Sequence, residues 1–361
     1  ISTILLALSV GSFFLTPDRA FSENENRYLQ LTPRLTWDRI MSGDFMEDVE
    51  DYTSDQIVFR DFWTAARSVL QRAEGKEDIS GTYLGADGRY FAKVTDDSFD
   101  WVRLEKNAGY IRDFFAASGK PCTALIVPSP AGILRDMLPE NAPYFNEDKA
   151  FGRLGDILGS TLLDSRETLS AVDDPYYHTD HHWTTMGAYT GYLTLSQAMN
   201  GSSTLMENEP KLESDQFFGT TWSSSGATWV KPDSIYTWVS DKLGFQVTAY
   251  PDGKPVEGQL YVREKLEVKD KYAMFLGGNQ PLCVIENPNG TKGKLLVIRD
   301  SYSDSLAPFL AQDYQEVHLF DLRYNLTPIS QYVEENGIDQ VLVLYSASNF
   351  ATDANLRLIA R

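Results

Sequence analysis

The chain has 361 residues, of which 51 are acidic and 32 basic, so its formal net charge at pH 7 is −19. Nucleic acids are bound by Lys and Arg side chains that displace counterions, so this acidic balance argues against a nucleic-acid partner. A hydrophobic fraction of 42% and a charged fraction of 23% are typical of globular proteins. The length favours one large α/β domain with an appendage.

The chain begins with an apolar run, ISTILLALSVGSFFLTPDR, in which the apolar residues end before Pro17. The run is close in length to the core of a signal peptide and shorter than the roughly 20 residues that span a bilayer. A buried helix of the fold is the alternative interpretation. We expect residues 1–19 to be a signal peptide or membrane anchor, which places the protein outside the cytoplasm, at the outer face of the cytoplasmic membrane or the cell surface.

Residues 20–95 are expected to form an accessory region between this segment and the main domain. The stretch RDFWTAARSVLQRAEGK has a helical pattern. The stretch TYLGADGRYFAKV is typical of a β-hairpin in which Asp87 and Gly88 supply the turn.

The main domain is expected over residues 96–361. Short apolar runs alternate there with helical stretches, a pattern typical of a parallel sheet whose two faces are covered by helices. The expected strands are TALIVP, GSTLLD, KLLVIRD, EVHLFD and QVLVLYS. The expected helices are Trp101 to Ser118, Trp183 to Met199 and Pro328 to Asn336. Residues 207–289 interrupt the alternation and predict a β-rich insertion that walls a cleft.

The chain has two cysteines, Cys122 and Cys283. Two cysteines are too few for a disulfide scaffold, and they fit either a single bridge or two core thiols.

A serine follows one of the expected strands directly. In LLVIRDSYSDSLAPFL, Ser301 lies between an apolar run and a stretch that can begin a helix. Such a turn exposes a hydroxyl and lets the N–H groups of the helix N-terminus face a developing oxyanion. The alternative is that Ser301 or Ser303 only caps the helix, because Ser is a preferred N-cap.

Three of the four histidines lie in YYHTDHHWTTMGAY, between Tyr176 and Tyr189. A serine nucleophile needs a histidine beside it and a carboxylate that orients that histidine. In an extended segment the side chains of Asp180 and His182 point the same way, while that of His181 points elsewhere. The sequence thus offers a base and its orienting acid.

Two other interpretations of this segment stay open. His178, Asp180 and His182 could be alternate-position ligands of a zinc ion, since nitrogen and carboxylate oxygen both suit that metal. The segment could also be a polar turn without a chemical role.

At this point the motifs resemble a known family. TDHHWTTMGAY resembles the motif that names the DHHW proteins of Gram-positive bacteria, and FFGT, FLGGN and VIRDSYSDSLAPFL are similar to other segments of that family. The similarity covers essentially the whole chain. DHHW proteins in turn resemble the alginate O-acetyltransferase branch of the SGNH-hydrolase superfamily, in which a D-x-H-W segment and a later S-Y-S segment supply a catalytic triad.

The resemblance implies a three-layer α/β/α SGNH-hydrolase-like domain with a central parallel sheet, permuted so that the serine comes last. It implies a triad of Asp180, His182 and Ser301. Arg299 departs from the family pattern, which has a small residue before the serine. Further candidate contacts to the oxyanion or the substrate are Gly278, Asn279, Tyr302, Tyr345 and Trp183, although a β-turn explains the GGN sequence of the first two equally well.

The expected function is acyl transfer on cell-surface or cell-wall carbohydrate by an exported serine enzyme, either an O-acetyltransferase or an acetylesterase, without a cofactor. A transferase would need an acyl donor from a membrane protein, which would also explain a retained N-terminal anchor. Two alternatives remain. One is an inactive surface module that binds glycan through Trp183 and Trp222. The other is a metal-dependent hydrolase that uses His178, Asp180 and His182.

Overall fold

A computed structural model describes residues 16–22, 27–227 and 229–360 of the chain. Most of the expected signal or anchor segment, residues 1–19, therefore lies outside the described residues. Among the helices that the structure describes, none has both the length and the apolar character to cross a membrane.

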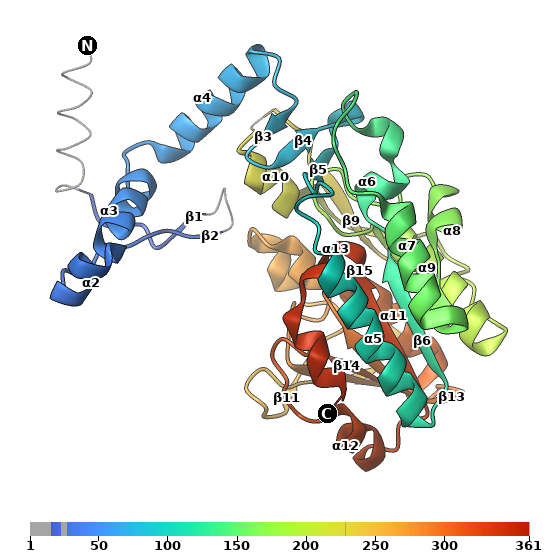
Figure 1. Ribbon diagram of the computed structural model, residues 1–361. Coiled ribbons are helices and arrows are strands. Elements are labelled where there is room, and N and C mark those ends of the chain that lie inside the picture. Colours follow the sequence, from blue (N-terminus) through green and yellow to red (C-terminus); the bar gives the residue numbers. More distant parts are fainter. Residues whose placement is uncertain (1–15, 23–26, 228, 361) are drawn as a thin grey trace, which may run out of the picture.

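The described part of the main domain is built on an eight-stranded sheet with the order β11-β10-β12-β14-β13-β15-β6-β7 (Figure 1). The five apolar runs expected as strands all belong to it and pair in parallel. They are β6 (Cys122–Val127), β7 (Leu162–Leu163), β13 (Lys292–Arg299), β14 (Tyr314–Phe320) and β15 (Gln340–Ser346). The expected α/β fold with a largely parallel central sheet is confirmed.

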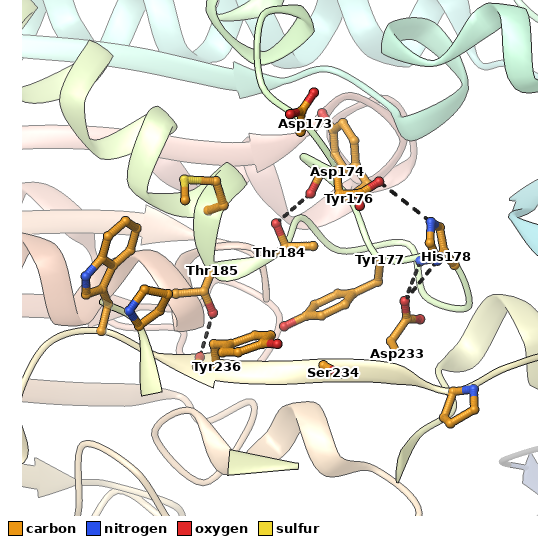
Figure 2. A pocket seen from close by; sticks show the side chains of 14 residues that line it. Asp173, Asp174, Tyr176, Tyr177, His178, Thr184, Thr185, Asp233, Ser234 and Tyr236 are labelled. Carbon is orange, nitrogen blue, oxygen red and sulfur yellow. Dashed lines mark hydrogen bonds and ion pairs between the residues drawn. The ribbon is translucent and has the colours of Figure 1, made fainter. Parts of the chain in front are cut away.

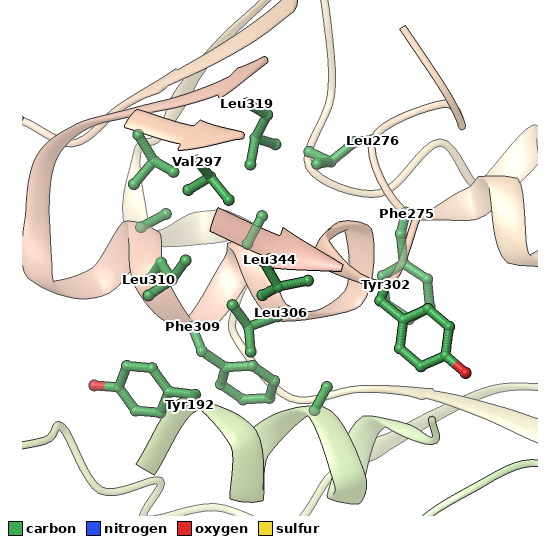
Figure 3. Packing of buried hydrophobic residues seen from close by; sticks show 14 of the residues in the cluster. Tyr192, Phe275, Leu276, Val297, Tyr302, Leu306, Phe309, Leu310, Leu319 and Leu344 are labelled. Atoms are coloured by element: carbon green, nitrogen blue, oxygen red, sulfur yellow. The ribbon is translucent and has the colours of Figure 1, made fainter. Parts of the chain in front are cut away.

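Alternate residues of the central strands pack against different helical layers, because successive side chains of a strand point to opposite faces. Leu295 and Val297 of β13 lie in the apolar cluster with α9 (Thr185–Asn200) and α11 (Ser303–Asp313). Figure 3 shows Val297 close to side chains of α11. The intervening Leu296 and Ile298 lie in a second cluster with the helices of the other face, which are α5 (Trp101–Ser118), α7 (Glu147–Leu158), α12 (Ile329–Glu335) and α13 (Ala347–Thr352).

All three helices expected in the main domain are present, and two begin later than expected, α9 by two residues and α12 by one. Helix α9 begins at Thr185 because Thr184 is its N-cap, with a side-chain oxygen that accepts a hydrogen bond from the N–H of Gly187 at 3.2 Å. A side chain at Gly187 would place its Cβ 2.1 Å from the carbonyl oxygen of Pro175. The small residue therefore lets α9 lie close against the loop that carries the histidines.

Residues 207–289 contribute strands to two sheets. The first two, β8 (Lys211–Phe217) and β9 (Asp233–Thr237), form an antiparallel pair of their own. The other three, β10 (Gln246–Ala249), β11 (Val256–Glu257) and β12 (Leu282–Glu286), extend the central sheet antiparallel beyond β14. The sequence pattern identified the parallel strands and did not indicate this antiparallel extension. Cys122 and Cys283, on β6 and β12, are both free thiols.

The described N-terminal residues form an arm that projects from the main domain (Figure 1). Its elements are β1 (Phe21–Ser22), β2 (Arg27–Tyr28), α2 (Trp37–Ser42), α3 (Asp44–Asp55) and α4 (Arg60–Ala73). Helix α4 contacts the main domain where the Ser68 hydroxyl donates to the carbonyl of Ser225 at 3.0 Å.

The hairpin expected after this arm is present as β4 (Thr82–Leu84) and β5 (Tyr90–Ala92), joined on one side by β3 (Asp78–Ile79). Asp87 and Gly88 both have positive φ angles, 53° and 74°. A two-residue turn with this geometry matches the twist of a hairpin, which explains the Asp-Gly signal in the sequence. The remaining helices are α6 (Pro130–Ile133), α8 (Arg166–Ser170) and α10 (Thr220–Ser225).

Candidate active site

Ser301 lies in the turn between β13 and α11, at the carboxyl edge of the sheet, where open parallel sheets bind their ligands. The preceding Asp300 is fully buried and fixes the turn. Its carboxylate accepts the N–H of Tyr302 at 3.0 Å and the N–H of Ser346, at the end of the neighbouring β15, at 2.8 Å. The N-cap of α11 is Tyr302, and no side chain caps that helix. The Ser301 hydroxyl is therefore available for another partner.

That partner is His182. The Nε2 atom of His182 lies 2.8 Å from the Ser301 Oγ, and its Nδ1 atom lies 2.5 Å from Oδ1 of Asp180. Asp180 and His182 are almost completely buried, whereas Ser301 is partly exposed. A carboxylate on one ring nitrogen and a hydroxyl on the other is the arrangement by which a histidine can take a proton from a nucleophile.

The loop that carries Asp180 and His182 is bent, although the sequence analysis assumed an extended segment. Its ends are joined by a bridge between Tyr176 and Trp183. Within it the N–H of His182 donates to Oδ1 of Asp180 at 3.0 Å. Asp180 and His182 face the same site because the carboxylate binds both the backbone and the ring of a residue two positions later. Asp180 and His182 thus pair as predicted, but in a bent loop and not in an extended segment.

Asp180 receives further support from the segment FFGT. The N–H and the hydroxyl of Thr220, at the start of α10, donate to Oδ2 of Asp180 at 2.8 and 3.0 Å. A Cβ on Gly219 would lie 2.2 Å from the Cβ of Asp180, so the close approach of the two segments requires glycine there. The contact with Asp180 therefore explains the glycine and the threonine of the FFGT segment.

The environment of Asp180 favours its ionised form. Burial alone raises the pKa of its carboxyl, but the adjacent rings of His181 and His182 and the N–H of Thr220 outweigh burial and hold the pKa well below its usual range. Burial and the neighbouring His182 lower the pKa of His181 to about 4. The site at neutral pH therefore contains a carboxylate and a neutral His181, whose Nδ1 lies 2.8 Å from the Thr220 hydroxyl oxygen.

Tyr272 covers the His182 ring. The two rings are stacked, with centroids 3.8 Å apart and an interplanar angle of 10°. The Tyr272 hydroxyl donates to the carbonyl of Ser301 at 3.2 Å and to the Ser305 hydroxyl at 3.0 Å. Tyr272 thus contacts the base and the backbone of the serine at the same time. The sequence offered no signal for it, because it lies 90 residues from one and 29 from the other.

Two predicted contact residues pack beneath the site. Trp183 is fully buried, and its indole N–H donates to the carbonyl of Tyr302 at 3.0 Å and to Ser305 at 2.9 Å. Tyr302 is also buried, and its hydroxyl donates to the carbonyl of His181. Neither ring presents a face to solvent. Both side chains join the loop that carries the histidines to the turn that carries Ser301. Because Trp183 is buried, it is unsuited to the predicted role of a platform for glycan.

Among the described residues, the other predicted contacts make no hydrogen bond with Ser301 or His182. Asn279 is exposed, and its side-chain oxygen accepts from Arg323 at 3.2 Å. Gly278 has a φ of 91°, so the GGN sequence is a turn that favours glycine. Tyr345 is fully buried, with its hydroxyl 3.3 Å from Asp353. The hydrogen bonds of these residues give no support for an oxyanion role.

Arg299, which departs from the family pattern, is fully buried at the end of β13, two residues before the serine. Its guanidinium pairs with the Asp304 carboxylate at 2.5 Å, within α11. Burial raises the pKa of Asp304 to about 6, and the arginine opposes that rise. A buried charge needs such a partner, so Arg299 and Asp304 are one structural unit behind the serine.

The set proposed for zinc is not assembled in the described structure. His178 lies 3.7 Å from Asp174 and 3.7 Å from Asp233, in a different cavity from Asp180 and His182. Among the described residues, the group whose ligand atoms come within 4.8 Å of one another is Asp180, His181 and His182. Asp180 and His182 are already hydrogen-bonded to each other, which leaves this group poorly arranged for a shared ion.

A cavity of about 210 Å³ opens beside the site. His181 and Tyr302 line it on the side of the catalytic candidates, and Phe91, Pro130 and Tyr144 make most of its surface apolar. Its position at the carboxyl edge of the sheet suits the apolar part of a substrate.

The α/β/α layers form an SGNH-hydrolase-like fold. A family model described as a DHHW protein matches residues 168–320, and one described as an SGNH hydrolase-like domain of the acetyltransferase AlgX matches residues 95–225. The matched part of the chain is similar to DHHW proteins, and the resemblance seen in the sequence is confirmed. No curated protein matches the sequence.

Solved structures with the same fold agree with this assignment. A DHHW family protein from Eubacterium siraeum DSM 15702 is 21% identical, with a TM-score of 0.68 over 78% of this chain and 95% of that chain. PatB1 from Bacillus cereus, solved with a sulfonyl adduct, is 20% identical, with a TM-score of 0.64 over 76% of this chain and 97% of that chain. At these identities the likeness establishes the fold.

Proposed function

We propose that the chain is an exported serine acyl-transfer enzyme, an O-acetyltransferase or acetylesterase that acts on cell-surface carbohydrate. The observation that carries the proposal is the hydrogen-bonded series from Asp180 through His182 to Ser301. The match to an acetyltransferase family model over residues 95–225 supports the acyl chemistry.

The first half of the reaction follows from the positions of these atoms. His182 Nε2 takes the hydroxyl proton as Ser301 Oγ bonds to the carbonyl carbon of an acetyl ester, and the carbonyl oxygen becomes an oxyanion. Asp180 stabilises the imidazolium through Nδ1. When the oxyanion collapses, the bond to the ester oxygen breaks, and that oxygen leaves as an alcohol with the proton from His182.

The second half repeats these steps with a new acceptor. A hydroxyl of a carbohydrate, or water, gives its proton to His182 and attacks the acetyl group on Ser301, and the serine leaves with that proton. A sugar acceptor makes the enzyme a transferase, and water makes it an esterase. The transferase would receive its acetyl group from a membrane protein, next to which an N-terminal anchor would hold it.

The test is covalent labelling. Wild-type protein and Ser301→Ala are incubated with 4-nitrophenyl acetate, and both intact mass and released nitrophenol are measured. We expect one acetyl group on the wild type, or turnover that is absent from Ser301→Ala. Ser303→Ala is the matched control, because Ser303 donates to the carbonyl of Asp300 at 2.9 Å and has no contact with His182.

Equal and negligible reaction in all three proteins would contradict the proposal. A sulfonyl fluoride gives a second readout, because PatB1 has been solved with a sulfonyl adduct. Absence of both labels, with glycan binding retained, would favour the inactive binding module. Activity that chelators abolish would favour the metal-dependent hydrolase.

A further inference from the structure

A second cavity, of about 430 Å³, lies against both ends of the histidine loop (Figure 2). Tyr177 and His178 line it from the start of the loop, and Thr184 and Thr185 from its end. Strand β9 forms another wall. Neither Ser301 nor His182 is among the residues that line it. Its size is within the range of roughly 300–1,000 Å³ that is usual for small-molecule sites.

One buried polar group in this cavity lacks a partner. Tyr177 is 3% exposed, and among the described residues its hydroxyl has no hydrogen-bond partner. Figure 2 shows that hydroxyl directed toward Tyr236 and Thr185 across the cavity. A buried hydroxyl without a partner is unfavourable, and a ligand in the cavity would relieve this by supplying a hydrogen bond.

The rest of the wall combines aromatic rings with carboxylates. Tyr236 and Trp238 line one side and are both partly exposed, which leaves ring surface available to a ligand. Asp173 and Asp174 lie at the rim and are exposed, and their oxygens accept hydrogen bonds. Among the described residues no lysine or arginine lines the cavity, and Arg89 pairs with Asp174 at its rim. Aromatic surface beside hydrogen-bond acceptors suits a polyhydroxylated ring, and the negative charge disfavours an anionic one.

We propose that this cavity binds a neutral hexose unit of a glycan, away from the position where acyl transfer takes place. The proposal rests on the proposed function for its choice of a carbohydrate. A sugar unit bound in this cavity would anchor the glycan, so that another unit of the same glycan can lie at Ser301.

Asp233 connects this cavity to the active-site loop. Its side chain lines the cavity and accepts the N–H groups of His178 and Thr179 at 2.9 and 2.7 Å. Asp180 is the next residue along the chain. A sugar in the cavity would therefore contact the segment that positions the acid of the active site.

The test measures binding without turnover. The full chain with Ser301→Ala is titrated with three neutral sugars, cellotriose, tri-N-acetylchitotriose and maltotriose, by isothermal titration calorimetry. We expect saturable binding of at least one of them. In the same background, Tyr236→Ala should weaken binding about tenfold or more, and Tyr177→Phe, which removes only the hydroxyl, about threefold to tenfold.

Tyr324→Ala is the matched control, because Tyr324 is 55% exposed and lies outside this cavity, so its loss should leave binding unchanged. No binding of any of the three sugars, or equal binding by the Tyr236 and Tyr324 variants, would overturn the proposal, as would binding only of a cationic glucosamine trimer. Hydrolysis of 4-nitrophenyl acetate by Tyr236→Ala with Ser301 intact is measured in parallel. Sugar binding without any ester hydrolysis in the wild type would refute the proposed function and leave this inference standing.

Discussion

One short loop carries two histidines, His178 and His182, and each is paired with an aspartate in a different environment: Asp180 on the same loop, and Asp233 on β9. In the first, His182 and Asp180 are 2.5 Å apart, and the ring also contacts Ser301. In the second, His178 and Asp233 are 3.7 Å apart, and the Asp233 carboxylate binds backbone N–H groups. The pKa of Asp180 lies below its usual range, whereas burial raises that of Asp233. Both carboxylates are buried and both accept hydrogen bonds, and it is the two adjacent rings of His181 and His182 that lower the pKa of Asp180.

The difference between the pairs also separates two functions. Asp180 can hold an imidazolium, because its charge is stabilised and its partner faces a hydroxyl. Asp233 fixes the backbone of the loop, and burial together with Arg89 lowers the pKa of His178, which keeps that ring neutral. The variants below test whether the loop has one chemical pair and one structural pair.

The largest difference is expected between the two histidines. His182→Ala should lower the rate of 4-nitrophenyl acetate hydrolysis on the order of 10⁴-fold, because it removes the proton acceptor of the serine. His178→Ala should change that rate less than threefold. Steady-state kinetics on both variants, with circular dichroism to verify folding, measure the contrast. Similar losses in both would mean that His182 has no special role.

The two carboxylates should differ next. Asp180→Asn keeps the size of the side chain and removes the charge that holds the imidazolium, so we expect a rate loss of about 10³-fold. Asp233→Asn should lower the rate of the folded protein less than tenfold and reduce the free energy of unfolding by about 1–3 kcal/mol, since it weakens bonds to buried N–H groups. Kinetics and urea denaturation measure the two effects. A greater rate loss in the Asp233 variant would reverse the assignment.

Much of the fold could be predicted from the sequence, because the parallel strands are nearly continuous apolar runs that only a sheet covered on both faces can bury. The strands β10 and β12 were not placed in this sheet, because no local pattern in the sequence marks the antiparallel pairing of β12 with β14, although LCVI in β12 is itself an apolar run. A local pattern was also insufficient for Asn279: its GGN sequence resembles an oxyanion donor, but in the structure it forms an exposed turn.

In the candidate active site, too, some residues could be predicted from the sequence and others could not. Asp180, His182 and Ser301 could be selected because short motifs contain them. Thr220 and Tyr272 could not, because they reach the site from 40 residues after Asp180 and from 29 before Ser301, and no local spacing marks such contacts. The sequence motifs thus contain the candidate catalytic groups, while the residues that contact them from distant segments are seen only in the tertiary structure.

A methyl group added at Gly219 should disturb the pair of His182 and Asp180 and leave the pair of His178 and Asp233 intact. In Gly219→Ala the new Cβ would lie 2.2 Å from the Cβ of Asp180, so the carboxylate must shift. A displacement of about 1 Å near reacting groups can cost about 10²-fold in rate, and we expect a loss of that order. Gly155→Ala is the control, because its Cβ would meet no atom within 4 Å. Equal rates in both variants would show that the position of Asp180 is not limiting.

The smallest effect concerns the hydroxyl of Tyr272. Tyr272→Phe keeps the ring that stacks on His182 and removes the bonds to the Ser301 carbonyl and the Ser305 hydroxyl. One such bond contributes about 1 kcal/mol, so the rate should fall about fivefold if the hydroxyl positions the serine. A lower kcat with an unchanged KM would locate the effect in the chemical step. Tyr324→Phe, at an exposed site, controls for loss of a hydroxyl, and a drop confined to the free energy of unfolding would give Tyr272 a structural role only.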